Sequence, residues 1–278
     1  MQDLTRMVFL VLALFAAGCS SGTGDTAAHL GQAQLLSVPG DGFTPPPSNA
    51  AAAALPVNGW KDVSLPYTAT RDILGPSGAA RTITDWYRLD LTGLPPSAET
   101  VHLYIPRWKT VGQLAIYGDG QLLYQSEGSL VYNGYNHPLL LMLNGAAGVP
   151  APASVLLRID RLQASGSALS TVWAGTARQL VWRYQVRTFL QNQLPFVGVS
   201  AFFALGLFSL AVWCKRRRES LYLLFFITSA AAFVRMQHYY IGGNYLPLPD
   251  AWMQWITVSS LMWLIVLVNS FMERLHKR

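Results

Sequence analysis

Three apolar runs in the C-terminal part of the chain constrain its fold more than any other feature. They cover residues 194–214, 221–241 and 252–271, and each is close to the roughly 20 residues that cross a hydrocarbon layer of about 30 Å. Hydrophobic residues make up 51% of the 278 residues and charged residues only 12%, which is too apolar for a typical soluble domain. We therefore predict three transmembrane helices.

A block of cations separates the first two apolar runs. Lys215, Arg216, Arg217 and Arg218 stand in sequence as "KRRRE" with the following glutamate, and cationic loops are retained on the cytoplasmic side of bacterial membranes. The block therefore predicts a tight cytoplasmic turn. Residues 272–278 form a second basic flank, predicted to be a cytoplasmic tail that is truncated at Arg278.

The net charge of +6 could also indicate a nucleic-acid surface, where lysine and arginine neutralise phosphates. Much of this charge adjoins the apolar runs, so membrane topology explains it better. We expect a membrane partner and no nucleic acid. The two cysteines, Cys19 and Cys214, lie beside apolar runs and form neither a disulfide framework nor a zinc site.

Two polar residues fall within or near the outer end of the second predicted span. Arg235 and His238 would be costly in hydrocarbon without a partner or a water-filled cavity. The alternative is that the long arginine side chain extends to the outer headgroups. The sequence favours this second interpretation and leaves the first one open.

The first 19 residues have the features of an export signal. Arg6 precedes an apolar run over residues 7–15, which is too short to span a bilayer, and small residues follow up to Cys19. The segment resembles a bacterial lipoprotein signal, in which the cysteine receives lipid and becomes the mature N-terminus. This resemblance implies lipidation of Cys19; ordinary cleavage nearby or no cleavage are the alternatives.

The next two segments differ sharply in composition. Residues 20–55 are rich in Gly, Pro, Ser and Ala, which predicts a flexible tether because such a segment buries too little apolar surface to offset its ordering. Residues 56–175 contain short β-rich runs between turn residues, and Gly118, Asp119 and Gly120 suit a hairpin turn. We predict an antiparallel β-sandwich or jelly roll over 56–175.

Residues 176–193 predict a helix that connects the β domain to the first span. Ala177, Leu180, Val181, Tyr184 and Thr188 recur at spacings of three and four residues, which places them on one face of a helix. The arginines of this segment lie mostly elsewhere on the helix.

Two stretches of the predicted β domain are candidates for ligand binding. Arg107, Trp108 and Lys109 combine an aromatic ring with two cations that could stack on a sugar and bind hydroxyl or acidic groups. A polar and aromatic loop that holds Tyr135, Asn136 and His137 could close over the same ligand. The plainer interpretations, which the sequence favours, are core packing for the tryptophan and an Asn/Gly turn for the loop.

Catalytic signatures are missing from the sequence. The histidines are scattered, and neither a phosphate-binding glycine loop nor an H-E-x-x-H or G-x-S-x-G motif occurs. We predict no catalytic residue, no cofactor and no metal site for this chain.

Several stretches carry a resemblance to a known family. They are "WYRLDL", "VHLYIPRWKTVGQLAIYGDGQLLYQS", "NHPLLLML", "SALSTVWAG" and "RRRESLYLLFFITSAAAFVRMQHYY". Over residues 55–278 the chain resembles bacterial seven-transmembrane receptors with diverse intracellular signalling modules. The resemblance implies a galactose-binding-like jelly roll outside the cell membrane and a histidine kinase or diguanylate cyclase inside it, although only three spans and neither effector are present in this sequence.

The leading hypothesis is the sensory and membrane-anchoring portion of a signalling receptor in the bacterial inner membrane, with a periplasmic N-terminal domain. Its expected partners are a small-molecule or carbohydrate ligand and a cytoplasmic effector domain or response regulator, with a homodimer as one allowed assembly. Two alternatives remain open: the same architecture feeding a diguanylate cyclase, and a membrane-tethered carbohydrate-binding module without signalling. A sugar-binding accessory domain of an enzyme is a weaker third.

Overall fold

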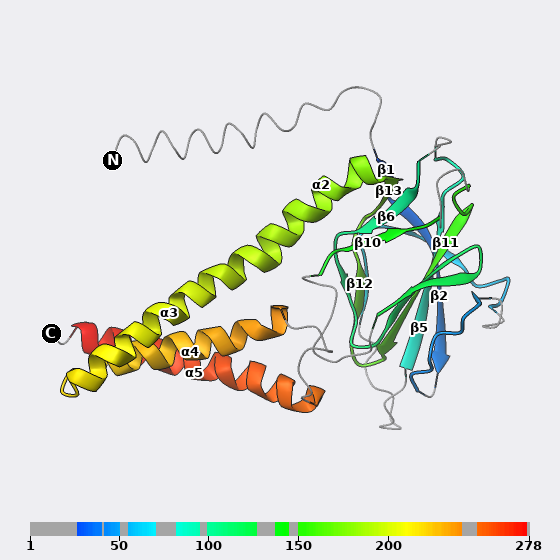
Figure 1. Ribbon diagram of the computed structural model, residues 1–278. Coiled ribbons are helices and arrows are strands. Elements are labelled where there is room, and N and C mark those ends of the chain that lie inside the picture. The colour runs from blue at the N-terminus through cyan, green and yellow to red at the C-terminus, as the bar shows by residue number, and fades with distance from the viewer. Residues whose placement is uncertain are drawn as a thin grey trace.

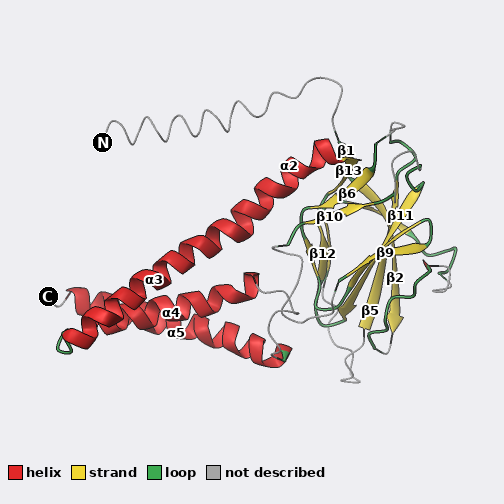
Figure 2. Ribbon diagram, viewed as in Figure 1, coloured by secondary structure: helices red, strands yellow, loops and turns green. Residues whose placement is uncertain are grey.

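A computed structural model describes residues 27–40, 42–50, 55–70, 82–94, 99–126, 137–144, 150–240 and 249–276. These residues form a domain of antiparallel β-sheets followed by long apolar helices (Figures 1 and 2). The predicted order of a β domain and then helices is confirmed. The predicted signal segment, including Cys19, lies outside the described residues.

In the part of the chain that the structure describes, the β domain consists of three antiparallel sheets. The first contains β1 (Ala28–Leu30), β13 (Val172–Thr176), β6 (Val101–Ile105) and β10 (Leu139–Met142), in that order. The second contains β3 (Lys61–Ser64), β2 (Gln32–Gly40), β5 (Thr82–Asp90), β11 (Ser154–Leu162), β8 (Leu114–Gly118) and β9 (Gln121–Gln125). A small third sheet contains β4 (Tyr67–Ala69), β12 (Ser167–Leu169) and β7 (Trp108–Lys109).

The first two sheets enclose the main apolar core. Leu103 and Val172 come from the first sheet, and Tyr87, Ile116 and Leu157 come from the second; all five are almost fully buried in one cluster. Alternate residues of a strand point to opposite faces of the sheet, so the residues that alternate with these core residues face outward. This alternation gives the first sheet an outer face that can receive a helix.

The predicted hairpin is confirmed. β8 and β9 pair antiparallel, and Asp119 and Gly120 have positive φ angles of 47° and 80° at the turn between them. Glycine and aspartate adopt such angles at low cost, which suits the twist of a tight hairpin.

The prediction of a flexible tether over residues 20–55 is wrong for residues 28–30 and 32–40, which form strands. Ala28–Leu30 pairs with β13, and Gln32–Gly40 lies between β3 and β5 in the second sheet. Ala33 and Leu35 of β2 belong to the main core, so this segment is an integral part of the β domain. The β domain therefore includes residues 28–40 and does not begin at 56, because pairing with distant strands stabilises a segment whose own apolar pattern is short.

One helix leads from the β domain into the first apolar run. α2 (Ala177–Thr188), the π-helical segment η2 (Phe189–Gln193) and α3 (Leu194–Lys215) follow one another and form a continuous helix of 39 residues. The π-helical segment directly precedes Leu194 and Pro195. Since proline cannot donate a backbone hydrogen bond, a local change of helical geometry before it has a plain cause.

α4 (Ser220–Tyr240) packs against α3, and α5 (Asp250–His276) packs against α4 (Figure 1). Three helices in the described part of the chain are long and apolar enough to cross a membrane: Ala177–Lys215, Ser220–Gln237 and Trp255–His276. α5 continues through most of the segment predicted to be a tail. Many of its large apolar side chains are exposed, for example Trp263 at 62%, as a lipid-facing surface requires.

Candidate functional site

An open cleft separates the outer face of the first sheet from the connecting helix. Its volume is about 910 Å³. Tyr104, Arg107 and Trp173 line it from the β domain, and Trp182, Arg183, Arg187, Leu190 and Gln191 line it from α2 and η2. The cleft therefore lies where the β domain meets the helix that continues into the first apolar run.

α2 is fixed to the β domain at its first residues. β13 ends at Thr176 and α2 begins at Ala177, and Thr176 and Gln179 form a capping box in which the Thr176 N–H donates to Gln179 Oε1 at 2.9 Å. Leu180 is fully buried against Tyr104 and Ala27. A cap and a buried anchor at the start of a helix restrict its orientation, so the direction of α2 relative to β13 is restricted at this end.

Aromatic and cationic side chains form the wall of the cleft. The Arg183 guanidinium lies 4.3 Å from the centre of the Trp173 ring, within the range of a cation–π contact. Burial raises the pKa of the Tyr104 phenol, and the neighbouring Arg187 and Arg183 guanidinium groups oppose that rise. Both observations place positive charge beside the aromatic surface.

The Gln191 amide lies between two arginines. With its oxygen turned toward Arg107, that oxygen accepts from Nη2 at 2.6 Å and from Nε at 3.2 Å. The opposite orientation places the same oxygen 3.4 Å from Arg187 Nε. The first orientation gives the shorter contacts and joins the π-helical segment to the β domain.

The sequence-predicted ligand residues are only partly brought together. Arg107 lines the cleft and also a smaller neighbouring cavity of about 170 Å³, which Trp108 and Lys109 help to line. Trp108 is 2% exposed and belongs to the main core, which agrees with the packing interpretation. Lys109 is exposed on β7.

His137 lies at a different contact. Its Nδ1 is 3.3 Å from Asn192 Nδ2, so it joins the segment before β10 to η2. Tyr135 and Asn136 lie outside the described residues. Arg107–Gln191 and His137–Asn192 are thus two contacts between the β domain and the π-helical segment.

Sequence reasoning missed most of the cleft. The sequence predicts only that the arginines of the connecting helix, which include Arg183 and Arg187, lie mostly off its apolar face, and it predicts no role for Trp173 or Trp182. A signal was present, since Arg183 and Arg187 are four residues apart and such residues share one helix face. The sheet face opposite them could not be identified without the strand pairing.

Of the two polar residues predicted to lie in or near the second span, Arg235 has a described contact. Arg235 Nη1 donates to the Thr257 carbonyl oxygen at 3.0 Å, so Arg235 bridges α4 and α5. This is the partner interpretation that the sequence had left open. His238 lies in α4, but its side chain lies outside the described part.

The cationic block forms the predicted tight turn. α3 ends at Lys215, the Arg216 N–H donates to the carbonyl oxygens of Val212 and Trp213, and the Glu219 N–H donates to the Arg216 carbonyl oxygen. The Arg217 guanidinium lies 5.3 Å from the Trp213 ring centre. Arg218 and Lys215 complete the block between α3 and α4.

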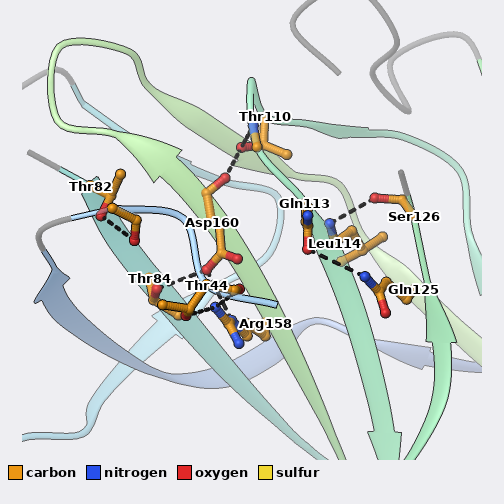
Figure 3. A network of polar contacts seen from close by, with 12 residues as sticks. Thr44, Thr82, Thr84, Thr110, Gln113, Leu114, Gln125, Ser126, Arg158 and Asp160 are labelled. Atoms are coloured by element: carbon orange, nitrogen blue, oxygen red, sulfur yellow. Dashed lines mark hydrogen bonds and ion pairs between the residues drawn. The ribbon is translucent and has the colours of Figure 1, made fainter. Parts of the chain in front are cut away.

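A polar network is buried on the outer face of the second sheet (Figure 3). Asp160 Oδ1 accepts from Thr84 Oγ1 at 2.8 Å and from Arg158 Nε at 3.0 Å. Arg158 Nη2 also donates to the Thr44 carbonyl oxygen at 2.8 Å. This network fixes the segment around Thr44 over the sheet, which indicates a structural role.

No protein-family model and no curated protein matches the chain. Among solved structures, a beta-glucuronidase from Faecalibacterium prausnitzii is similar over 51% of this chain and 22% of its own length, with 16% identity and a TM-score of 0.30. The matched part is therefore a small fraction of that enzyme. A likeness at this level assigns neither family nor activity to this chain.

Proposed function

We propose that this chain is the sensory and membrane-anchoring portion of a bacterial signal-transduction receptor. One observation carries the proposal: β13 passes without a loop into a 39-residue helix that continues into the first apolar span. A ligand bound in the cleft contacts both the sheet and this helix. It can therefore favour one of two arrangements of the helix and bias an effector on the other side of the membrane.

The proposed topology places the β domain in the periplasm and the turn at Lys215–Arg218 in the cytoplasm. The Arg274 guanidinium donates to Ser220 Oγ, so the end of α5 lies beside the start of α4. This gathers the basic residues of α5 and of the α3–α4 turn at one end of the helices, as expected for the cytoplasmic side of a multi-pass inner-membrane protein.

The finer parts of the proposal rest on the sequence resemblance. They are a jelly-roll, galactose-binding-like architecture for the β domain and a histidine kinase as the effector, with a diguanylate cyclase as the alternative. The two sheets around one core support the sandwich architecture. Fold by itself does not identify a ligand or an effector.

The proposal is tested by removing the β domain from the chain in its native cell. Deletion of residues 27–174 leaves the helices and the Thr176 cap in place. We expect the shortened chain to stay in the membrane fraction while phosphorylation of response regulators changes. A change in cyclic di-GMP instead would identify a cyclase output.

A control is Gln121→Ala, at an exposed position on β9 in the second sheet that does not line the cleft, which is expected to alter neither readout. If the deletion leaves phosphorylation and cyclic di-GMP unchanged, the receptor proposal is wrong. Glycan binding by the intact chain would then favour the membrane-tethered binding module.

A further inference from the structure

The cleft gathers three guanidinium groups. Arg183 and Arg187 come from α2, and Arg107 comes from the connection between β6 and β7. Among the described residues that line the cleft there is no aspartate or glutamate. A cavity that concentrates charge of one sign focuses its potential and favours a ligand of the opposite sign.

Aromatic and neutral polar groups contact these three guanidinium groups. The Arg183 guanidinium lies 4.3 Å from the centre of the Trp173 ring, and such a cation–π contact does not neutralise the charge of the guanidinium. Among the described residues that line the cleft, the Gln191 amide oxygen accepts from Arg107 and the Tyr104 hydroxyl lies beside Arg187, and both of these groups are neutral. Neutral acceptors form weaker hydrogen bonds to guanidinium than an anion does.

The cleft also lies close to the start of the first apolar span. Arg187 precedes Leu194, the first residue of α3, by seven residues, which is about 10 Å along a helix. Between them, Phe189 and Leu190 are 50% and 47% exposed, and Trp182 is 63% exposed on the same helix. Exposed aromatic and aliphatic side chains next to arginines are typical of the membrane interface, where lipid phosphates lie.

We propose that this cleft binds a phosphate group through Arg107, Arg183 and Arg187. A phosphate presents more acceptor oxygens than a carboxylate, and several guanidinium groups can bind it together. The phosphate belongs either to the headgroup of an anionic phospholipid or to a soluble phosphate ester. The inference deepens the proposed function and rests on it for the membrane placement of α3.

The test is a binding titration of the full-length chain in neutral detergent micelles, followed by native mass spectrometry. The probes are phosphatidylglycerol, phosphatidylcholine and glycerol 3-phosphate. We expect a phosphate probe with net negative charge to bind about tenfold or more tightly than phosphatidylcholine, as charge-assisted hydrogen bonds allow. Because the contact is ionic, binding should weaken as the salt concentration rises.

Arg187→Gln tests the arginine cluster, and Arg178→Gln is its matched control. Both remove one cation from α2, but Arg178 is exposed and does not line the cleft. We expect Arg187→Gln to weaken binding about tenfold and Arg178→Gln to leave it unchanged. Arg187→Lys retains the charge without the planar fork, so an intermediate affinity is expected.

The probes also distinguish the two sources of the phosphate. Tight binding of phosphatidylglycerol without binding of glycerol 3-phosphate supports a lipid headgroup. Binding of glycerol 3-phosphate that displaces the lipid supports a soluble ester. The inference is overturned if neither anionic probe binds more tightly than phosphatidylcholine, or if Arg178→Gln causes the same loss as Arg187→Gln.

Failure of this inference differs from failure of the receptor proposal. If the phosphate probes do not bind but deletion of residues 27–174 still changes signalling, only the ligand class is wrong. If the probes bind as expected but the deletion changes no signal, the phosphate-site inference is supported and the receptor proposal is wrong.

Discussion

Asp85 and Arg161 form an ion pair inside the β domain, and both are almost fully buried. Asp85 Oδ2 accepts from Arg161 Nε at 2.7 Å and from Ser167 Oγ at 3.1 Å, and Asp85 Oδ1 accepts from Ser37 Oγ at 2.6 Å. These contacts join β5, β11, β2 and β12. A single carboxylate therefore links the second sheet to the small third sheet.

Replacement of this carboxylate should strongly destabilise the domain. Asp85→Ala leaves the Arg161 charge buried and uncompensated, and breaking a buried pair in this way costs about 3–5 kcal/mol. We expect a corresponding fall in the free energy of unfolding, measured by urea denaturation of the full-length chain in detergent. Asp62→Ala, at an exposed position on β3, should change it by less than about 0.5 kcal/mol; equal losses would contradict a special role for Asp85.

Tyr87 gives the β domain a predicted sensitivity to alkaline pH. Burial, and then the Asp85 carboxylate, raise the pKa of its phenol above the ordinary value of 10.0. A raised pKa in the folded state leaves stability unaffected below about pH 10 and decreases it as the pH rises above the unfolded value.

The measurement is the free energy of unfolding between pH 8 and pH 11. The wild-type chain should lose more stability over the alkaline part of this range than Tyr87→Phe, which has no phenolic proton to lose. Parallel profiles for the two chains would show that Tyr87 does not contribute to the alkaline loss.

At the scale of elements, the contact between α3 and α4 depends on one glycine. A Cβ atom added at Gly206 would lie 1.8 Å from Ser229 Oγ and 2.8 Å from Ser229 Cβ. Gly206 and Ser229 are both buried. Small residues allow helices to approach closely in a membrane, where packing and not the hydrophobic effect holds them together.

Gly206→Leu should therefore separate α3 from α4 and lower the thermal stability of the helical part in detergent. Gly198→Leu is a matched control on the same helix, because a Cβ there has nothing within 4 Å. We expect a loss of about 1–3 kcal/mol for the first variant, the usual range for overpacking, and none for the second. Similar melting temperatures for both variants would contradict close packing at Gly206.

At the scale of the whole molecule, the proposed topology places the β domain and Cys214 on opposite sides of the membrane. Cys214 is exposed at the end of α3, beside the cationic turn. Gln121 is exposed on β9, in the β domain. Two single-cysteine chains, both with Cys19→Ser, can report the two sides: one retains Cys214, and the other carries Gln121→Cys with Cys214→Ala.

An impermeant maleimide added to intact spheroplasts should label the Gln121→Cys chain and not the Cys214 chain. Both should react after the membrane is disrupted, which is the control for reactivity. Labelling of Cys214 in intact spheroplasts would contradict the cytoplasmic placement of the turn.

The elements that sequence reasoning predicted well are those with strong local signals. The apolar runs are long, the hairpin turn contains Gly120 with its positive φ, and the cationic block stands between two spans. The strand Gln32–Gly40 was missed, because its neighbours β3 and β5 are distant in sequence. Local composition at a Pro- and Gly-rich segment carries no information about such pairing.

The candidate site was predicted less well for the same reason. Arg107 was selected from its local combination with Trp108 and Lys109, but the structure buries Trp108 in the core and joins Arg107 to Gln191. Arg183 and Arg187 become part of a site only because α2 lies across the outer face of the first sheet.

The sequence by itself determined the β domain, the connecting helix and the apolar helices in their order, because periodicity, length and turn residues act over a few neighbours. Only the tertiary structure decided that residues 28–40 complete the sheets, that Arg235 bridges α4 and α5, and that three arginines share one cleft. These features join residues far apart in the chain. Their positions follow from strand register and helix packing, which depend on the whole fold.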